Sequence, residues 1–123
     1  MDRPIRILLV EDNEVFREAL VLLFGLRDDV EIVAAIGEGE GAVQAAREHR
    51  PDVVLMDYRL PGMDGVQATR AVLEAELGVA VVGLTGEADP RETQALFDAG
   101  AIACVTKDSE LETIVSIVVE AAP

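Results

Sequence analysis

The sequence has little of several residue types on which common protein classes depend. It contains one cysteine, Cys104, and no tryptophan. A single cysteine cannot form a disulfide within the chain, which excludes a disulfide-stapled secreted domain and favours a reducing, cytoplasmic setting. No apolar run approaches the ~20 residues that a membrane-spanning helix needs. We therefore expect no membrane-spanning role.

Positive charge is also scarce. Ten Lys and Arg residues stand against 24 Asp and Glu residues, so the net charge is −14. Nucleic-acid affinity depends on cationic side chains that neutralise phosphates, so we do not expect this chain to bind DNA or RNA directly. Hydrophobic residues nevertheless make up 50% of the 123 residues. This length and composition predict one domain, residues 1–123, with a core of its own.

Short runs rich in Val, Ile and Leu alternate with longer amphipathic stretches. The stretches repeat apolar residues at helical spacing, most clearly from Glu14 onward. Five strands that are apolar on both faces and alternate with five helices indicate an α/β fold with a mostly parallel sheet. The predicted strands are Ile5–Val10, Val30–Ala34, Val53–Met56, Val79–Leu84 and Ala101–Thr106.

Helix start and stop signals support this division. Asp89 precedes Pro90, which favours an N-cap at Asp89, and Glu92 is spaced to reach back to that cap. Ser109 and Glu112 have the same spacing and predict a capping box before the last helix. A glycine stands where the preceding helix must stop, before the fifth strand.

Polar side chains stand at the ends of four predicted strands. Glu11 and Asp12 follow the first strand, and Asp57 follows the third. Thr85 follows the fourth strand, and Lys107 follows the fifth. Ligands of open parallel α/β sheets bind beyond the carboxyl ends of the strands, so we expect these side chains to meet at one edge.

Three carboxylates at one site repel each other, so either one of them holds a proton or a cation lies among them. A small set of oxygen ligands with room for water suits Mg²⁺. A carboxylate can form an acyl phosphate when a metal and a cation balance the developing charge, which makes Asp57 the candidate nucleophile. Lys107 and Thr85 are then candidates to bind phosphoryl oxygens.

Several segments together resemble the receiver domain of two-component response regulators, especially receivers that precede a LuxR-type helix-turn-helix. The resemblance implies a flavodoxin-like, doubly wound sheet of five parallel strands in the order 2-1-3-4-5 with five helices. It also implies a phosphoprotein that acts as a switch and not as a conventional turnover enzyme. The matching segments are Ile7–Asn13, Val54–Gly65, Leu84–Thr85, Gly100–Ala101 and Lys107–Asp108.

The resemblance also implies roles for individual residues. Asp12 and Asp57 would bind Mg²⁺ directly, Glu11 would act through water, and the Arg59 carbonyl would complete the protein ligands. A sensor histidine kinase or a phosphotransfer protein would donate the phosphoryl group to Asp57. Phosphorylation would then reshape the face formed by the fourth helix, fifth strand and fifth helix. That face would act on an output domain or a partner. We expect the partner to include a second copy of the chain, and the output to be the control of transcription.

The sequence departs from the family pattern at positions around the site. Cys104 stands where relatives commonly carry a Tyr or Phe that rotates on activation, and Asp108 stands where many have proline. A thiol cannot fill the space that an aromatic ring would occupy, which puts the usual switch in question. Arg59 and Glu87 flank the expected path of attacking water, and we expect them to pair and hinder hydrolysis.

Two other functions remain open from the residues alone. A haloacid-dehalogenase-type phosphatase also uses Asp, Thr or Ser, Lys and Mg²⁺, but its first strand closes as Asp-x-Asp, whereas this one closes as Glu11-Asp12-Asn13. A receiver-like interaction module that works without phosphorylation is the second alternative, and Cys104 gives it some weight.

Overall fold

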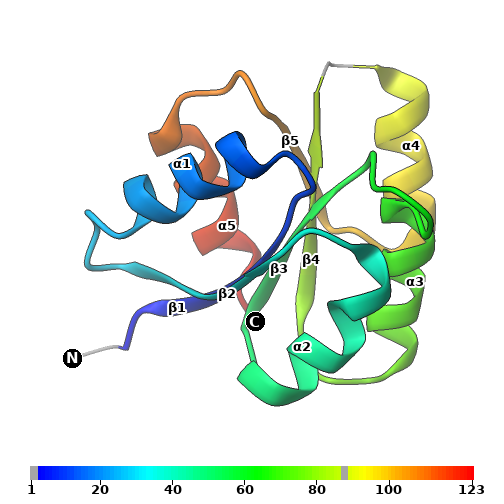
Figure 1. Ribbon diagram of the computed structural model, residues 1–123, viewed down its shortest axis with the longest axis horizontal. Coiled ribbons are helices and arrows are strands. Elements are labelled where there is room, and N and C mark those ends of the chain that lie inside the picture. The colour runs from blue at the N-terminus through cyan, green and yellow to red at the C-terminus, as the bar shows by residue number, and fades with distance from the viewer. Residues whose placement is uncertain (1–2, 87–88) are drawn as a thin grey trace.

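The structure, a computed structural model, describes residues 3–86 and 89–123. Within them, strands and helices alternate along the chain (Figure 1). None of the helices in this described part is long and apolar enough to cross a membrane. The elements are β1 (Ile5–Val10), α1 (Glu14–Phe24), β2 (Val30–Ile36), a 3-10 turn (Gly39–Gly41), α2 (Ala42–His49), β3 (Val53–Asp57), α3 (Gly65–Glu74), β4 (Ala80–Thr85), α4 (Pro90–Ala99), β5 (Ala103–Thr106) and α5 (Leu111–Ala121).

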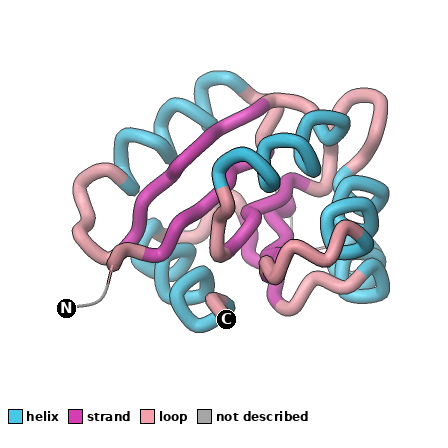
Figure 2. The backbone as a smooth tube through the Cα atoms, turned by 90° about the horizontal axis from the view of Figure 1, so that it is seen from below, coloured by secondary structure: helices cyan, strands magenta, loops and turns pink. Residues whose placement is uncertain are grey.

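The strands form one parallel sheet in the order β2-β1-β3-β4-β5, with helices on both faces (Figures 1 and 2). Helices α1 and α5 cover one face, and α2, α3 and α4 cover the other. Successive side chains of a strand point to opposite faces. Ile7 and Leu9 of β1 accordingly pack under α1 and α5, whereas Leu8 and Val10 pack under α2 and α3. This confirms the flavodoxin-like α/β fold.

The strand bounds differ from the predicted ones at both ends: β2 extends to Ile36, and β4 and β5 begin at Ala80 and Ala103, one and two residues later than predicted. β1 has the predicted bounds, while β3 extends to Asp57 and β4 extends to Thr85. Both residues take part in the sheet register, because Asp57 pairs with Leu84 and Thr85 pairs with Thr106. Asp57 and Thr85 are therefore fixed by the sheet itself and not by a loop that follows it.

The predicted N-cap of α4 is confirmed, and the predicted N-cap of α5 is wrong. The Asp89 side chain accepts a hydrogen bond from the Arg91 backbone N–H, 2.9 Å away, as expected of an N-cap. The N-cap of α5 is Glu110, which makes no side-chain capping bond. Ser109 lies one residue too early to cap the helix, and its hydroxyl lies 2.9 Å from the Thr106 hydroxyl. The predicted stop after α4 is confirmed, since Gly100 adopts a left-handed backbone conformation with φ of 114°.

Thr69 of α3 offers a test of the packing between α3 and the sheet. Its side chain is fully buried, and its hydroxyl has no hydrogen-bond partner. Replacing an unsatisfied buried hydroxyl by a methyl group of similar size removes a desolvation cost of about 1 kcal/mol. We expect Thr69→Val to raise the free energy of unfolding by about that amount, measured by urea denaturation.

The exposed Thr113 of α5 provides the matched control, because it allows the same change on a helix surface. Thr113→Val is expected to change stability by less than about 0.5 kcal/mol, the usual limit for surface substitutions. A loss of stability in Thr69→Val would show that the hydroxyl does have a partner in solution.

Candidate functional site

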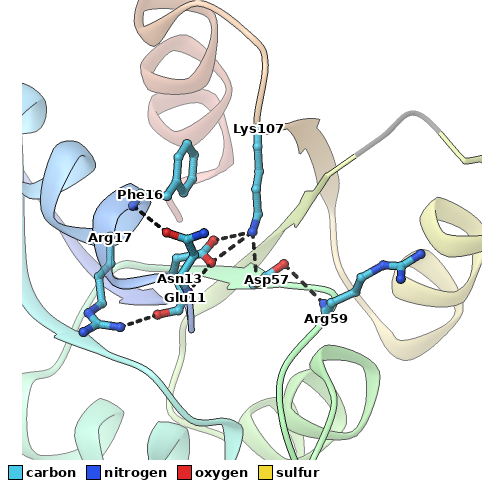
Figure 3. A network of polar contacts seen from close by, with 7 residues as sticks. All are labelled: Glu11, Asn13, Phe16, Arg17, Asp57, Arg59 and Lys107. Carbon is cyan, nitrogen blue, oxygen red and sulfur yellow. Dashed lines mark hydrogen bonds and ion pairs between the residues drawn. The ribbon is translucent and has the colours of Figure 1, made fainter.

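Three predicted side chains meet at the carboxyl edge of the sheet (Figure 3). Glu11 follows β1, Asp57 ends β3 and Lys107 follows β5. Glu11 and Asp57 are buried, and the Lys107 side chain reaches them from above as seen in Figure 3. Lys107 Nζ donates hydrogen bonds to Glu11 Oε2 at 3.0 Å and to Asp57 Oδ2 at 3.1 Å. Residues separated by up to 96 positions in the sequence thus form one polar network.

The carboxylates form an acidic cluster. One carboxylate oxygen each from Glu11, Asp12 and Asp57 lies within 4.8 Å of the others. Glu11 and Asp57 are buried, whereas Asp12 is exposed at the mouth of the cluster. The structure therefore brings together the acids that the strand ends predict.

Burial and like charge determine the electrostatics of this cluster. The pKa of Asp57 is raised to about 7, first by burial and then by the charge of Glu11, against the opposing effect of Lys107. Burial lowers the pKa of Lys107, but its hydrogen bond to Glu11 and the charge of Asp57 outweigh this, so the pKa is raised. The pocket thus favours a bound positive charge beside its carboxylates.

The donor set of the cluster fits a hard divalent cation. Glu11 Oε1 is buried and accepts no hydrogen bond, although Lys107 Nζ lies 2.8 Å away. Asp12 adds an exposed carboxylate on the solvent side, where water can complete a coordination shell. Oxygen ligands in this number and accessibility match Mg²⁺ better than a softer metal.

Residues at the start of α1 hold the cluster in place. The Asn13 backbone N–H donates to Glu11 Oε2 at 2.9 Å, and the Asn13 side chain caps α1 through the Phe16 N–H, also at 2.9 Å. Arg17 Nη1 donates to the Glu11 carbonyl at 2.8 Å. The Phe16 ring lies under the ammonium of Lys107, with Nζ 5.3 Å from the ring centroid. The sequence analysis missed these supporting roles, although Asn13 before an amphipathic helix is a recognisable N-cap signal.

Thr85 lies beside this network. Its side chain is buried, and its carbonyl accepts a hydrogen bond of 2.8 Å from the Lys107 backbone N–H. This bond ties the ends of β4 and β5 together, so the backbone of Thr85 positions the residue that carries the ammonium.

The predicted pair between Arg59 and Glu87 stays a prediction. Glu87, the expected partner, lies outside the described residues. Among the described residues, Arg59 forms an ion pair with Glu92, in which Arg59 Nη2 lies 2.7 Å from Glu92 Oε2. Glu92 therefore does not reach back to the Asp89 amide as the sequence predicts. The Arg59 backbone N–H donates to Asp57 Oδ1 at 3.2 Å.

A groove lies next to the site, between α4, β5 and α5. It has a volume of about 590 Å³, and Thr85, Cys104 and Phe97 are among its lining residues. Cys104 is only partly buried, and burial raises the pKa of its thiol. The Cys104 side chain thus lines this groove.

The parallel sheet, the helices on both faces and the acidic cluster at its carboxyl edge define a receiver-type α/β domain. Residues 7–119 match the family described as response regulator receiver domain, and the chain belongs to this family.

Similar proteins include transcriptional regulators and a signalling enzyme. A protein named "Probable transcriptional regulatory protein NarL" from Mycobacterium tuberculosis is 34% identical over 118 residues, which cover 96% of this chain and 55% of that protein. A protein-glutamate methylesterase/protein-glutamine glutaminase of Nitrosospira multiformis is 39% identical over 106 residues, covering 84% of this chain and 30% of that protein. The chain thus spans about half, or less, of the length of these curated relatives.

Solved structures show the same fold. The signal receiver domain of NarL from Mycobacterium tuberculosis superposes with a TM-score of 0.91 at 33% identity, covering 97% of this chain and 96% of that chain. A DNA-binding response regulator of the LuxR family from Staphylococcus aureus gives a TM-score of 0.86 at 27% identity, covering 94% and 97% of the two chains. The resemblance stated from the sequence is therefore confirmed.

Proposed function

We propose that this chain accepts a phosphoryl group on Asp57 in a Mg²⁺-dependent reaction and transmits the change to an output domain or partner. The observation that carries the proposal is the contact of Lys107 Nζ with both Glu11 and Asp57, two acids buried at the ends of different strands. The ammonium of Lys107 contacts both buried acids, and Asp12 adds an exposed carboxylate beside them. This arrangement suits a phosphoryl group together with a divalent cation.

Asp57 acts as the nucleophile in the proposed transfer. A carboxylate oxygen of Asp57 forms a new bond to phosphorus while the phosphorus–nitrogen bond to the donor histidine breaks, and the released imidazole nitrogen takes up a proton. Lys107 exchanges its bond to Asp57 for a phosphoryl oxygen and balances the added negative charge. The Thr85 hydroxyl donates a hydrogen bond to another phosphoryl oxygen.

Glu11, Asp12 and Asp57, with the backbone carbonyl of Arg59, would hold the cation. Bound Mg²⁺ supplies positive charge that neutralises the phosphoryl oxygens during transfer. Glu11 also orients Lys107 in the absence of the phosphoryl group, because it is the second acceptor of the ammonium.

The proposed partners follow from the family and its relatives. The donor is a sensor histidine kinase or a phosphotransfer protein, and the receiving surface is the face of α4, β5 and α5. Because similar proteins include transcriptional regulatory proteins, we infer an output in transcription control through another domain or a homodimer. The chain itself is proposed to act in the cytoplasm as a switch without turnover of a free substrate.

Intact-mass spectrometry after incubation with acetyl phosphate tests the proposal. We expect one phosphoryl adduct per chain in the presence of Mg²⁺, labile to hydroxylamine as an acyl phosphate is. Removing Mg²⁺ with a chelator is expected to lower the initial rate at least about tenfold, because the acidic cluster then repels the incoming phosphoryl group.

Two outcomes would contradict the proposal. Absence of any adduct with Mg²⁺ present would favour an interaction module that works without phosphorylation. Repeated turnover of a simple phosphomonoester would favour a phosphatase.

A further inference from the structure

An ion pair links the loop after β3 to the first turn of α4. The Glu92 side chain is only 10% exposed, whereas that of Arg59 is 77% exposed. Figure 3 shows the Arg59 backbone beside Asp57 and its side chain extending away, toward α4. A nearly buried carboxylate on α4 is thus paired with an exposed cation whose own backbone contacts Asp57.

The spacing of α4 offers Glu92 a second partner within its own helix. In a capping box, the side chain of the third helical residue accepts a hydrogen bond from the N-cap backbone N–H. α3 forms this arrangement completely, since Gln67 accepts the Asp64 N–H at 3.0 Å and Asp64 accepts the Gln67 N–H at 2.9 Å. α4 has the same spacing in Asp89 and Glu92, but there the carboxylate bonds to Arg59 instead.

A phosphoryl group on Asp57 would compete for the same arginine. It brings about two negative charges and strong acceptor oxygens to the residue whose Oδ1 already accepts the Arg59 N–H. Guanidinium groups bind such oxygens strongly, in paired charge-assisted hydrogen bonds. A carboxylate that stays buried without a partner is costly, so the Glu92 side chain would turn to the N-cap backbone N–H of its own helix.

We propose that Glu92 is a positioning residue with two partners: Arg59 holds it before phosphorylation, and the Asp89 backbone N–H receives it once the phosphoryl group has drawn Arg59 away. The proposal rests on the proposed function, because the phosphoryl group on Asp57 triggers the exchange. Through this exchange, phosphorylation of Asp57 would reach α4 without an aromatic switch residue at position 104, where this chain has Cys104. The start of α4 is then tethered to the β3–α3 loop in one state and released in the other.

Hydrogen exchange of the Asp89 amide tests the proposal. Beryllofluoride with Mg²⁺ serves as the probe, because it mimics a phosphoryl group on a carboxylate. In the wild-type chain, the Asp89 amide is expected to exchange about fivefold more slowly after the probe binds, the effect of one exposed charged contact. Fluorine NMR of bound beryllofluoride independently reports whether the site is occupied.

Glu92→Gln separates the two partners of this residue. Glutamine can complete a capping box, as Gln67 does in α3, but it carries no charge to hold Arg59. We expect the Asp89 amide of Glu92→Gln to show the slow exchange already without the probe. Glu92→Ala, which can do neither, is expected to exchange fast in both states. Asp98→Asn, the same loss of charge at an exposed position of α4, is the matched control and should behave as wild type.

The outcomes distinguish this proposal from the one on which it rests. Absence of bound beryllofluoride in the wild-type chain would contradict the proposed function, and the partner exchange with it. Bound beryllofluoride without a change at the Asp89 amide, or a Glu92→Gln variant that behaves as wild type, would overturn the partner exchange alone.

Discussion

Asp57→Asn is expected to abolish the phosphoryl adduct, with a labelling rate at least about 100-fold below that of the wild-type chain. The amide has nearly the shape of the carboxylate but cannot act as the nucleophile. The substitution also removes one of two buried negative charges that face each other across Lys107. We therefore expect the variant to fold with at least the stability of the wild-type chain. Intact-mass spectrometry measures the adduct, and urea denaturation measures stability.

Loss of labelling identifies Asp57 as the acceptor only if no other acid of the site accepts the phosphoryl group. Asp12 is exposed beside Asp57, and a phosphodonor can reach it. Asp98→Asn provides a control for the loss of an exposed carboxylate and should label at the wild-type rate. Undiminished labelling of Asp57→Asn would place the acceptor elsewhere and would remove the basis of the mechanism.

The convergence of Glu11, Asp57 and Lys107 was predictable from the sequence because topology enforces it. Each residue stands at the end of an apolar run, and the carboxyl ends of parallel strands share one edge. The strand order itself came from the resemblance to receiver domains, since the alternation of strands and helices alone fits several orders. The prediction succeeded where a local pattern sufficed to place a residue at a strand end.

The ion pair between Arg59 and Glu92 was beyond local patterns. The two residues are 33 positions apart, and their contact depends on the path of the loop after β3. The sequence correctly indicated the N-cap at Asp89, but the capping box that it also predicted is not formed, because a charged group from another element binds Glu92. Such competition between local and tertiary partners is expected where a functional contact overrides a local preference.

The supporting role of Phe16 was missed for a different reason. Its position on the apolar face of α1 indicates packing, and packing is also what the structure shows. Only the three-dimensional arrangement places the ring under Lys107. Helical periodicity predicts which residues face the core, but it does not predict which other element contributes the neighbouring group.

Lys107→Met is expected to slow phosphorylation without weakening Mg²⁺ binding, whereas a variant with a disrupted site would lose both. Methionine keeps most of the length of lysine and removes the charge. Without the ammonium, the phosphoryl oxygens lose one of their charged partners, so we expect phosphorylation to slow about 100-fold. Lys107 is also the cation that now contacts Glu11 and Asp57, where Mg²⁺ would bind. Its removal is therefore expected to leave Mg²⁺ binding, measured by titration calorimetry, at least as tight as in the wild-type chain.

Arg70→Met serves as the control for this last prediction, because it removes a positive charge at an exposed position of α3. It should change neither the labelling rate nor the Mg²⁺ affinity, since exposed charges far from the site are screened by salt. Parallel loss of labelling and Mg²⁺ binding in Lys107→Met would mean that the lysine organises the whole pocket. Retained labelling at the wild-type rate would mean that the transferred group does not contact Lys107. The predicted difference arises only if the ammonium competes with Mg²⁺ for Glu11 and Asp57 and also binds the phosphoryl group that is transferred.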